Sequence, residues 1–410
     1  MKKIITGISF LLIAALLASP MSDLSAQDFS NTVPYQSLLI SDGCQFVPQK
    51  FFPKFSWETT PMYYMFGATA RVLSPDEVEF IAARTDFLCI EKSHGYKELG
   101  AAEKGAKHEA AAFKKIKPDI KVLFYFNSAW AWPFTSYNKN FTSERIVVYP
   151  ELKEFLVINP ETGELNDRRG TYSFDVLNPE FRQWWVETVA KGVEFSGCDG
   201  AFIDQMHGFF FLREDQKEEV HIAQGELITE LKKKLGPDKI VLGNNTTDDI
   251  ARFAYPAIDA NMFEHYSKDL LSKEKLLQDW ADMLRLARDG KMSIFRIGVE
   301  QDPFVKKSKT LPDTTLTGDE RTVLLAKERI EYHLACYLIG AQPYSYFQYG
   351  WGWTLASGSL IDFPELQKPL GSPKGAYKRI SPDSWEVTRE FEHASVWVDT
   401  ENGKARISWR

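Results

Sequence analysis

Cysteine is scarce in this chain, since the 410 residues contain only four and these lie far apart in the sequence. No Cys-x-x-Cys pair occurs, so cysteine spacing gives no sign of a zinc site. Cys89 lies in an apolar strand-like run and Cys336 in a helical pattern. We expect these two to be small buried apolar residues, while the disulfide state of the four cysteines stays open.

Sequence motifs for metals and cofactors are also missing. The seven histidines are scattered, with no His-x-His pair after the first predicted strand and no His-Glu-x-x-His helix. Neither a Gly-x-Ser-x-Gly elbow nor a Walker-type phosphate loop occurs. We therefore expect no metal ion and no cofactor.

An excess of basic residues is absent as well. The chain has 49 Lys and Arg against 56 Asp and Glu, a net charge of -7, whereas nucleic-acid-binding domains are usually basic. Beyond the N-terminal region no run reaches about 18 consecutive apolar residues, the length that a membrane span needs. We expect neither nucleic acid nor a membrane as a partner, and the oligomeric state stays open.

The first 26 residues have the pattern of a secretory signal peptide. Met1 to Lys3 give a positive start, Ile4–Ala18 is apolar, and a small-residue cleavage site ends at Ala26. No cysteine follows the apolar run closely, which argues against a lipoprotein anchor. The sequence predicts an exported protein, periplasmic or extracellular, with no membrane span after signal removal.

Strand-like runs alternate with helical patterns along most of the remaining chain, which predicts an α/β fold with a parallel sheet. Eight such units predict closure into a (β/α)8 barrel, the TIM-barrel fold. The eight runs are residues 62–66, 86–90, 121–126, 201–204, 239–242, 258–263, 292–297 and 343–347. After the eighth run the chain is rich in Gly, Ser and Pro and has no clear helical period.

Three segments are predicted to decorate the barrel of residues 61–375. Residues 27–60 form an N-terminal extension, and residues 128–177 form an insertion after the third strand. Residues 376–410 have strand composition and a hairpin turn at Glu401–Lys404, which predicts a small C-terminal β appendage packed on the barrel.

The fourth predicted strand ends abruptly in a carboxylate. Asn178 has the side chain of an N-cap, Pro179 suits the first helical position, and an apolar face continues to Ser196. After a Gly-rich turn the apolar run Ala201–Ile203 ends at Asp204. In (β/α)8 enzymes the C-terminal rim of the strands carries the chemistry, although an isolated Asp there can also cap the next helix or pair with an Arg.

Glu264 follows the sixth predicted strand, so it is expected at the same rim as Asp204. Two carboxylates from different strands are the minimum set for glycosidic bond cleavage, one as proton donor and the other as nucleophile or base. A separation of about 5–5.5 Å implies retention at the anomeric carbon, and about 6.5–9.5 Å implies inversion. The structural alternative for Glu264 is a salt bridge to a rim cation such as Lys92.

Amides and aromatic rings also follow several predicted strands. Amides both donate to and accept from sugar hydroxyls, and aromatic faces pack against the C–H face of a sugar ring. The alternative is that the rings pack long loops onto the barrel and that the histidines are hydrogen-bonded wall residues. The predicted substrate-binding residues are Asn127, Trp132, His207, Asn244, His265, Gln348 and Trp353.

Two segments resemble a known family. Cys198-Asp-Gly-Ala-Phe-Ile-Asp204 looks like the fourth strand of exported bacterial glycoside hydrolases. Pro369–Gly375 together with Arg389–Val398 is similar to hypothetical glycosyl hydrolase family 15. The placement of the acids also looks like that of α-galactosidase-type retaining barrels, a resemblance that implies Asp204 as nucleophile and Glu264 as acid/base. Those enzymes often have Asp at the second position, so Glu264 departs from their pattern.

These observations predict an exported glycoside hydrolase that cleaves a poly- or oligosaccharide with a carboxylate pair at the barrel rim. Two alternatives stay open. A carbohydrate-binding barrel without catalysis would keep the aromatic loops but would not need both acids. A metal-dependent hydrolase or deacetylase barrel would need clustered His and Asp in the pocket.

Overall fold

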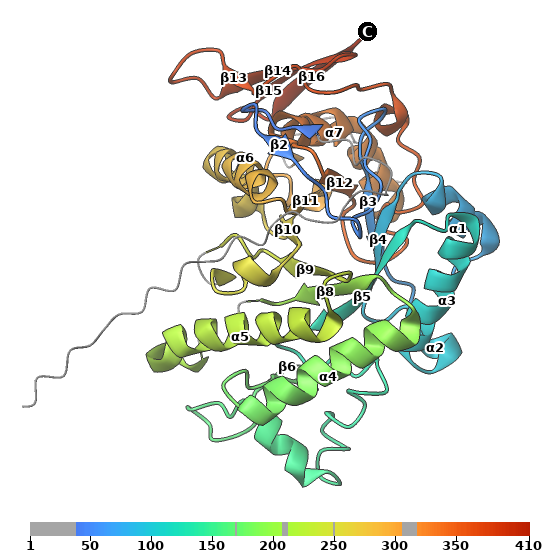
Figure 1. The fold of residues 1–410 in the computed structure, drawn as a ribbon, viewed down its shortest axis with the longest axis vertical. Helices are drawn as coiled ribbons and strands as arrows, with labels where there is room; N and C mark the ends of the chain where they lie inside the picture. Colours follow the sequence, from blue (N-terminus) through green and yellow to red (C-terminus); the bar gives the residue numbers. More distant parts are fainter. Residues whose placement is uncertain (1–37, 169, 207–211, 249–250, 306–317) are drawn as a thin grey trace, which may run out of the picture. The chain divides into compact units, whose positions relative to one another are not determined.

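Eight parallel strands form the centre of the fold (Figure 1). The structure is a computed structural model that describes residues 38–168, 170–206, 212–248, 251–305 and 318–410. The strands are β3 (Tyr63–Phe66), β4 (Phe87–Ile90), β5 (Lys121–Asn127), β8 (Gly200–Asp204), β9 (Ile240–Asn244), β10 (Ala260–Glu264), β11 (Met292–Ile297) and β12 (Ser345–Tyr349).

The sheet closes on itself, which confirms the predicted barrel. Each strand pairs in parallel with the next along the chain, from β3 through to β12. The two end strands meet at a parallel bridge between Met62 and Phe347, where the Phe347 amide donates to the Pro61 carbonyl at 2.8 Å. Because the ladder comes back to its first strand, the C-terminal ends of all eight strands face one rim.

The eighth strand begins later than the sequence predicted. Pro343 lacks an amide proton for the ladder, and Tyr344 has a φ of 62°, outside the β region. Pairing with β11 therefore starts at Ser345 and runs to Tyr349. Gln348, expected just past the strand, consequently lies within it.

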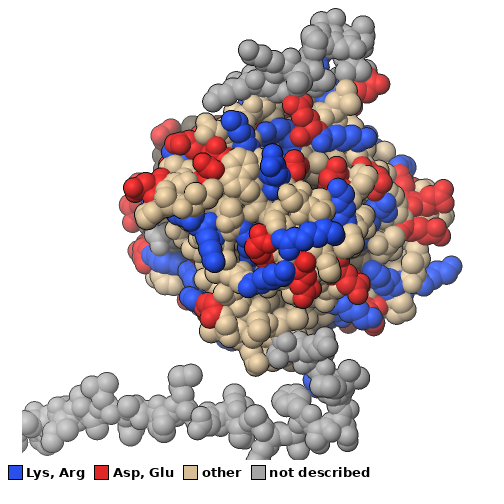
Figure 2. Space-filling model, turned by 90° about the horizontal axis from the view of Figure 1, so that it is seen from above, with Lys and Arg blue, Asp and Glu red and all other residues tan. Residues whose placement is uncertain are grey.

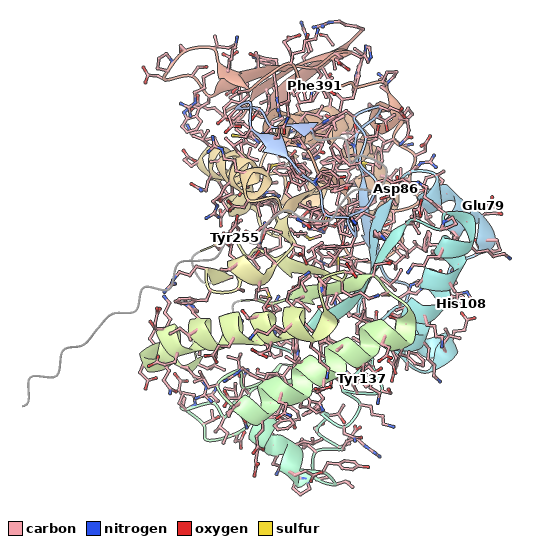
Figure 3. All side chains as sticks on the ribbon, viewed as in Figure 1. Glu79, Asp86, His108, Tyr137, Tyr255 and Phe391 are labelled. Atoms are coloured by element: carbon pink, nitrogen blue, oxygen red, sulfur yellow. The ribbon has the colours of Figure 1, made fainter. Side chains whose placement is uncertain are left out.

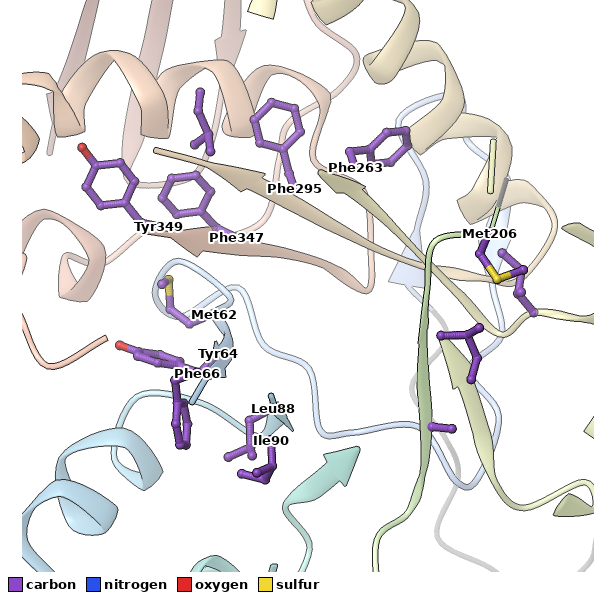
Figure 4. Packing of buried hydrophobic residues seen from close by; sticks show 14 of the residues in the cluster. Met62, Tyr64, Phe66, Leu88, Ile90, Met206, Phe263, Phe295, Phe347 and Tyr349 are labelled. Carbon is purple, nitrogen blue, oxygen red and sulfur yellow. The ribbon is translucent and has the colours of Figure 1, made fainter. Parts of the chain in front are cut away.

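Both faces of the barrel strands are apolar because each faces protein. The inner face carries residues such as Leu123, Phe202 and Ile294, all fully buried. The outer face packs against the helices, and Phe295 and Phe347 lie on neighbouring strands on that side (Figure 4). The Phe347 ring is stacked at 5.0 Å from Tyr337, a residue of the helix that covers β11 and β12.

Helices occupy most of the connections between the strands. Ser74 and Glu77 form a capping box at the start of the first of them. Asn178 accepts from the amides of Glu180 and Phe181 at the predicted N-cap. The helices are α1 (Pro75–Ala82), α2 (Tyr96–Leu99), α3 (Ala102–Ile116), α4 (Pro179–Ser196), α5 (Lys217–Leu235), α6 (Lys273–Arg288) and α7 (Gly318–Gly340).

Short strand pairs lie outside the barrel. An antiparallel pair, β1 (Leu38–Leu39) and β2 (Gln45–Phe46), precedes it. The segment between β5 and α4 holds the antiparallel pair β6 (Asp167–Arg168) and β7 (Thr171–Tyr172). Tyr137 of this segment lies beside α4 (Figure 3), with Lys191 Nζ 5.8 Å from its ring centroid.

An antiparallel sheet follows the barrel, as predicted. It consists of β13 (Lys378–Arg379), β14 (Glu386–Glu390), β15 (Ala394–Asp399) and β16 (Lys404–Trp409). Figure 1 shows this sheet beside α7. Phe391, which follows β14 (Figure 3), is fully buried against Trp57.

Arg389 joins this sheet to the C-terminal end of α7. Its Nη1 lies 2.9, 2.9 and 2.6 Å from the carbonyl oxygens of Leu338, Ile339 and Ala341. These carbonyls have no intrahelical partner, so a cation placed there satisfies them and favours the helix dipole. Burial lowers the pKa of Arg389 to about 10. The β appendage is thus tied to the helix that precedes β12.

Three further features concern the surface charges, the apolar character of the helices and the cysteines. On the face shown in Figure 2, basic and acidic side chains are interspersed. Within the described ranges no helix combines the length and apolar character of a membrane span. Cys44 is exposed, the other three cysteines are buried, and all four are free thiols. Cys89 and Cys336 are buried in β4 and α7, as expected from their apolar surroundings.

Candidate active site

Strand register brings the inward-facing polar side chains to one level of the rim. Asn127 pairs with Asp204 across β5 and β8, and Arg296 pairs with both Glu264 and Gln348 across β10, β11 and β12. Each of these residues lies two positions after an inward apolar residue, and alternate residues of a strand share a face. The carboxyl ends of several strands therefore deliver polar groups to the mouth of the barrel.

Asp204 is surrounded by hydrogen-bond donors. Its Oδ2 accepts from the Tyr125 hydroxyl and from Asn127 Nδ2 at 3.2 Å. Its Oδ1 accepts from Asn244 Nδ2 at 3.0 Å and from the Gln205 amide at 2.8 Å. Donors directed at both oxygens suit a carboxylate that carries a negative charge. Among the described residues neither structural alternative for Asp204 is seen, since it neither caps α5 nor pairs with an arginine.

The backbone turns sharply after β8 and β9. Gln205 and Asn245 directly follow Asp204 and Asn244, and they have φ values of 59° and 52°. The left-handed conformation is costly for residues other than Gly and is concentrated at functional sites. Here it directs the Gln205 amide back to Asp204 and places Asn245 Oδ1 2.9 Å from the Glu264 amide.

Glu264 has fewer donors than Asp204. Its Oε2 accepts from Asn244 Nδ2. Burial raises the pKa of Glu264, and the charge of Asp204 raises it further, against the opposing effects of Arg296, Asn244 and Lys92. The protonated form of Glu264 is thereby favoured over a wider pH range than for a solvent-exposed glutamate.

The Asn244 amide links the two carboxylates. One nitrogen donates to both Asp204 Oδ1 and Glu264 Oε2. Two ordinary hydrogen bonds that meet at one nitrogen hold their acceptor atoms no more than about 6 Å apart. The other end of the amide, Asn244 Oδ1, is buried without a hydrogen-bond partner among the residues that the structure describes.

A lysine and a third carboxylate lie on the other side of Asp204. Lys92 forms an ion pair with the buried Glu91, so it does not make the salt bridge to Glu264 that was the structural alternative. Burial alone would lower the pKa of Lys92, but the carboxylates around it, Glu91 first, outweigh burial and raise it. Burial also raises the pKa of Glu91.

Two cavities adjoin the acid pair. The smaller, of about 180 Å³, is lined by Met65, Glu91, Lys92, Tyr125, Asn127, Trp130, Trp132, Phe202, Asp204, Gln205, Asn244, Glu264 and Trp353. The larger, of about 390 Å³, is lined by Gln205, Met206, Asn244, Asn245, Asp248, Ala251, Glu264 and Tyr266. Three lining residues are common to both, so the cavities meet at Gln205, Asn244 and Glu264.

Six of the predicted site residues line the smaller cavity. These are the two acids together with Asn127, Trp132, Asn244 and Trp353. Trp353 also covers the guanidinium of Arg296, whose Cζ lies 3.9 Å from the ring centroid. His207 lies outside the described residues. The structure thus brings together side chains that come from β5, β8, β9, β10 and two rim loops.

Two predicted site residues lie elsewhere. His265 is buried, and its ring nitrogens face the Arg296 carbonyl at 2.6 Å and Asp279 Oδ2 at 2.8 Å, so no nitrogen is available to a sugar hydroxyl. Gln348 donates to the Met65 carbonyl at 3.5 Å and lines neither cavity. Both differ from the prediction of substrate contact. Neighbouring elements occupy both ring nitrogens of His265, whereas Gln348 Oε1 is buried without a hydrogen-bond partner among the described residues.

Sequence reasoning missed two polar residues beside the acids. Tyr125 donates to Asp204, and Arg296 is the buried cation closest in register to Glu264. Both lie within runs that were interpreted only as apolar strands. The alternation of faces would have revealed them, since each occupies an inward position at the C-terminal end of its strand.

A metal site is not evident in the described part of the chain, where no group of three or more His, Cys, Asp or Glu side chains is placed to hold an ion.

Known structures of similar fold include several carbohydrate-active enzymes. The α-amylase from Geobacillus thermoleovorans is 13% identical over 84% of this chain and 87% of that chain, with a TM-score of 0.49. An α-amylase from Anoxybacillus is 12% identical over 84% and 87%, with a TM-score of 0.46. The glycoside hydrolase domain of PelA from Pseudomonas aeruginosa is 13% identical over 58% and 83%, with a TM-score of 0.39. These values are too low to transfer any residue's role to this chain.

No curated protein matches the chain. A family model does match, over residues 114–395, a span that includes β8, β10 and the first two strands of the C-terminal sheet, β13 and β14. Since that span is more than half of the sequence, the chain belongs to hypothetical glycosyl hydrolase family 15.

Proposed function

We propose that this protein hydrolyses a glycosidic bond in a poly- or oligosaccharide with retention of configuration, using Asp204 as nucleophile and Glu264 as acid/base. The observation that carries the proposal is the Asn244 amide, which donates to both carboxylates. The separation of about 6 Å or less that follows favours the retaining geometry, because an inverting pair must leave room for a water molecule.

The different surroundings of the two acids support the roles. Asp204 accepts from several donors, so it is suited to act as an ionised nucleophile. Glu264 is half-buried, and its burial raises its pKa, so it is suited to hold the proton that a leaving oxygen needs. Pairs of acids whose surroundings separate their proton affinities are typical of acid/base catalysis.

The reaction then proceeds in two steps. In the first, Glu264 gives its proton to the glycosidic oxygen, the bond from that oxygen to the anomeric carbon breaks, and an Asp204 oxygen bonds to the carbon. In the second, Glu264 takes a proton from water, the water oxygen attacks the anomeric carbon, and the bond to Asp204 breaks with its electron pair returning to the carboxylate. Both carboxyl groups end in their starting states.

The walls of the smaller cavity suit a sugar. The aromatic rings of Trp132 and Trp353 border it, and Asn127 and Lys92 supply polar groups. Rings pack against the C–H face of a sugar, while amide and ammonium groups bind hydroxyls.

Export, which the pattern of residues 1–26 predicts, is also part of the proposal. N-terminal sequencing of the secreted protein should show a start at Gln27.

The experiment is a digestion screen over diverse poly- and oligosaccharides with the wild type and Asp204→Asn. We expect release of reducing sugar from at least one substrate by the wild type alone, with the starting anomer formed first in NMR spectra. Inversion would contradict the retaining mechanism. Binding without hydrolysis, at equal affinity in both proteins, would support a carbohydrate-binding barrel instead.

A further inference from the structure

The two cavities beside the acid pair differ in which acid they contact. Asp204 lines only the smaller cavity, whereas Glu264 and Asn244 line both. In a retaining hydrolysis the nucleophile contacts the sugar whose anomeric carbon it attacks, and the acid reaches the oxygen that joins this sugar to the leaving group. The acid that borders both cavities therefore marks the scissile bond.

From this asymmetry, and resting on the proposed function, we propose that the smaller cavity binds the sugar transferred to Asp204 and that the larger cavity binds the leaving sugar, with the ring of Tyr266 as its platform. This assignment fixes the direction in which the substrate chain runs across the rim. Its non-reducing side lies over Glu91 and Lys92, and its reducing side lies over Asp248 and Tyr266.

The size and lining of the smaller cavity fit a single sugar ring. Its volume is about 180 Å³. This is roughly the space of six water molecules in the liquid, which is enough for one sugar ring and too little for two. Three tryptophans, Trp130, Trp132 and Trp353, border it, and none borders the larger cavity. Rings around a small cavity restrict it to a ligand with apolar faces and polar edges, which describes a pyranose.

The larger cavity offers an exposed ring instead. Tyr266 is 62% exposed although it lies two residues after the half-buried Glu264. A large aromatic side chain beside a cavity is a typical binding platform, because a ligand ring that covers it removes apolar area from water. Asn245 and Asp248 line the same cavity and supply polar groups for hydroxyls.

The test compares two substrates of the same transferred sugar, a disaccharide and the glycosyl fluoride, because fluoride leaves the larger cavity without a sugar. We expect Tyr266→Ala to lower kcat/KM for the disaccharide on the order of ten-fold, as loss of one stacking contact does, and to leave the fluoride rate near that of the wild type. Tyr266→Phe retains the ring and is expected to behave like the wild type on both substrates.

Trp132→Ala is the matched variant in the smaller cavity, and we expect it to lower kcat/KM for both substrates. Equal losses on the two substrates in Tyr266→Ala would overturn the inference while the proposed function stands. A loss confined to the disaccharide in Trp132→Ala would reverse the orientation and also overturn it. Failure of the wild type to hydrolyse either substrate would instead contradict the proposed function.

A second readout needs no turnover. Because the tryptophans border only the smaller cavity, titration of Asp204→Asn with the monosaccharide should change tryptophan fluorescence. The double variant Asp204→Asn/Tyr266→Ala should bind the monosaccharide with the same Kd and the disaccharide about ten-fold more weakly. If the double variant bound the monosaccharide more weakly than Asp204→Asn does, Tyr266 would contact the transferred sugar rather than the leaving sugar, which would contradict the inference.

Discussion

The ends of β8 and β10 occupy equivalent places in the barrel, but they surround their acids differently. Asp204, at the end of β8, receives hydrogen bonds on both oxygens from side chains and backbone. Glu264, at the end of β10, is half-buried beside Arg296 and, among the described residues, receives a side-chain hydrogen bond at Oε2 alone. The backbone brings both acids to the same rim, whereas the neighbouring strands give each acid different hydrogen-bond donors and charges.

This difference has a structural origin in the strands on either side. β5 precedes β8 in the sheet and supplies Tyr125 and Asn127, both aimed at Asp204. β11 follows β10 and supplies Arg296, whose charge opposes the rise in the pKa of Glu264 without removing it. Each of the following substitutions tests one side of the comparison.

Asp204→Asn should have the largest effect. An amide cannot form the ester intermediate, so we expect kcat to fall roughly 10⁴-fold or more on every leaving group. Steady-state rates on a natural substrate and on an activated aryl glycoside would measure this. Activity that survives on the activated substrate would move the nucleophile to another carboxylate, of which Glu91 lines the same cavity.

Glu264→Gln should have a smaller effect that depends on the substrate. General acid catalysis contributes about 10²–10⁴-fold, and we expect that loss for sugar leaving groups. Activated leaving groups need no proton, so activity on them should persist, and added azide should raise the rate by replacing water in the second step. Equal loss on both kinds of substrate, without azide rescue, would reject the acid/base role.

Tyr125→Phe removes one donor from Asp204. A hydrogen bond to a charged group is worth about 1.5–3 kcal/mol, so we expect kcat/KM to fall roughly 10- to 100-fold. Tyr63→Phe is the matched control, because Tyr63 is also buried inside the barrel but its hydroxyl has no partner among the described residues. Similar losses in both variants would indicate a general effect on barrel packing.

Arg296→Met should have the smallest effect, visible in the pH profile. The positive charge of Arg296 lowers the pKa of Glu264 against the larger effect of burial, so its removal raises that pKa further. Because the acid must be protonated, activity falls as pH rises through this pKa, and the basic limb of kcat/KM should move to higher pH. Arg285 is exposed on α6, so Arg285→Met should leave the basic limb of kcat/KM at the same pH as in the wild type.

Local sequence patterns predicted the barrel, its C-terminal sheet and the convergence of Asp204 and Glu264, because short continuous apolar runs that end in a polar residue are a local signal. The surroundings of the site depend on long-range pairing. His265 turned away from the cavity because α6 supplies Asp279 and β11 a carbonyl. Tyr125 and Arg296 lie inside runs that are apolar in overall composition, so only the alternation of faces along each strand distinguishes them.

The most direct test is to trap the intermediate. A 2-deoxy-2-fluoro glycosyl fluoride of the preferred sugar slows both steps, because fluorine disfavours the oxocarbenium-like transition state, while fluoride still leaves readily. Peptide mapping by mass spectrometry should then find one fluorosugar attached to Asp204, and turnover should resume slowly when an acceptor is added. A label on Glu264 or Glu91, or rapid hydrolysis to an inverted product with no adduct, would contradict Asp204 as the nucleophile of a retaining enzyme.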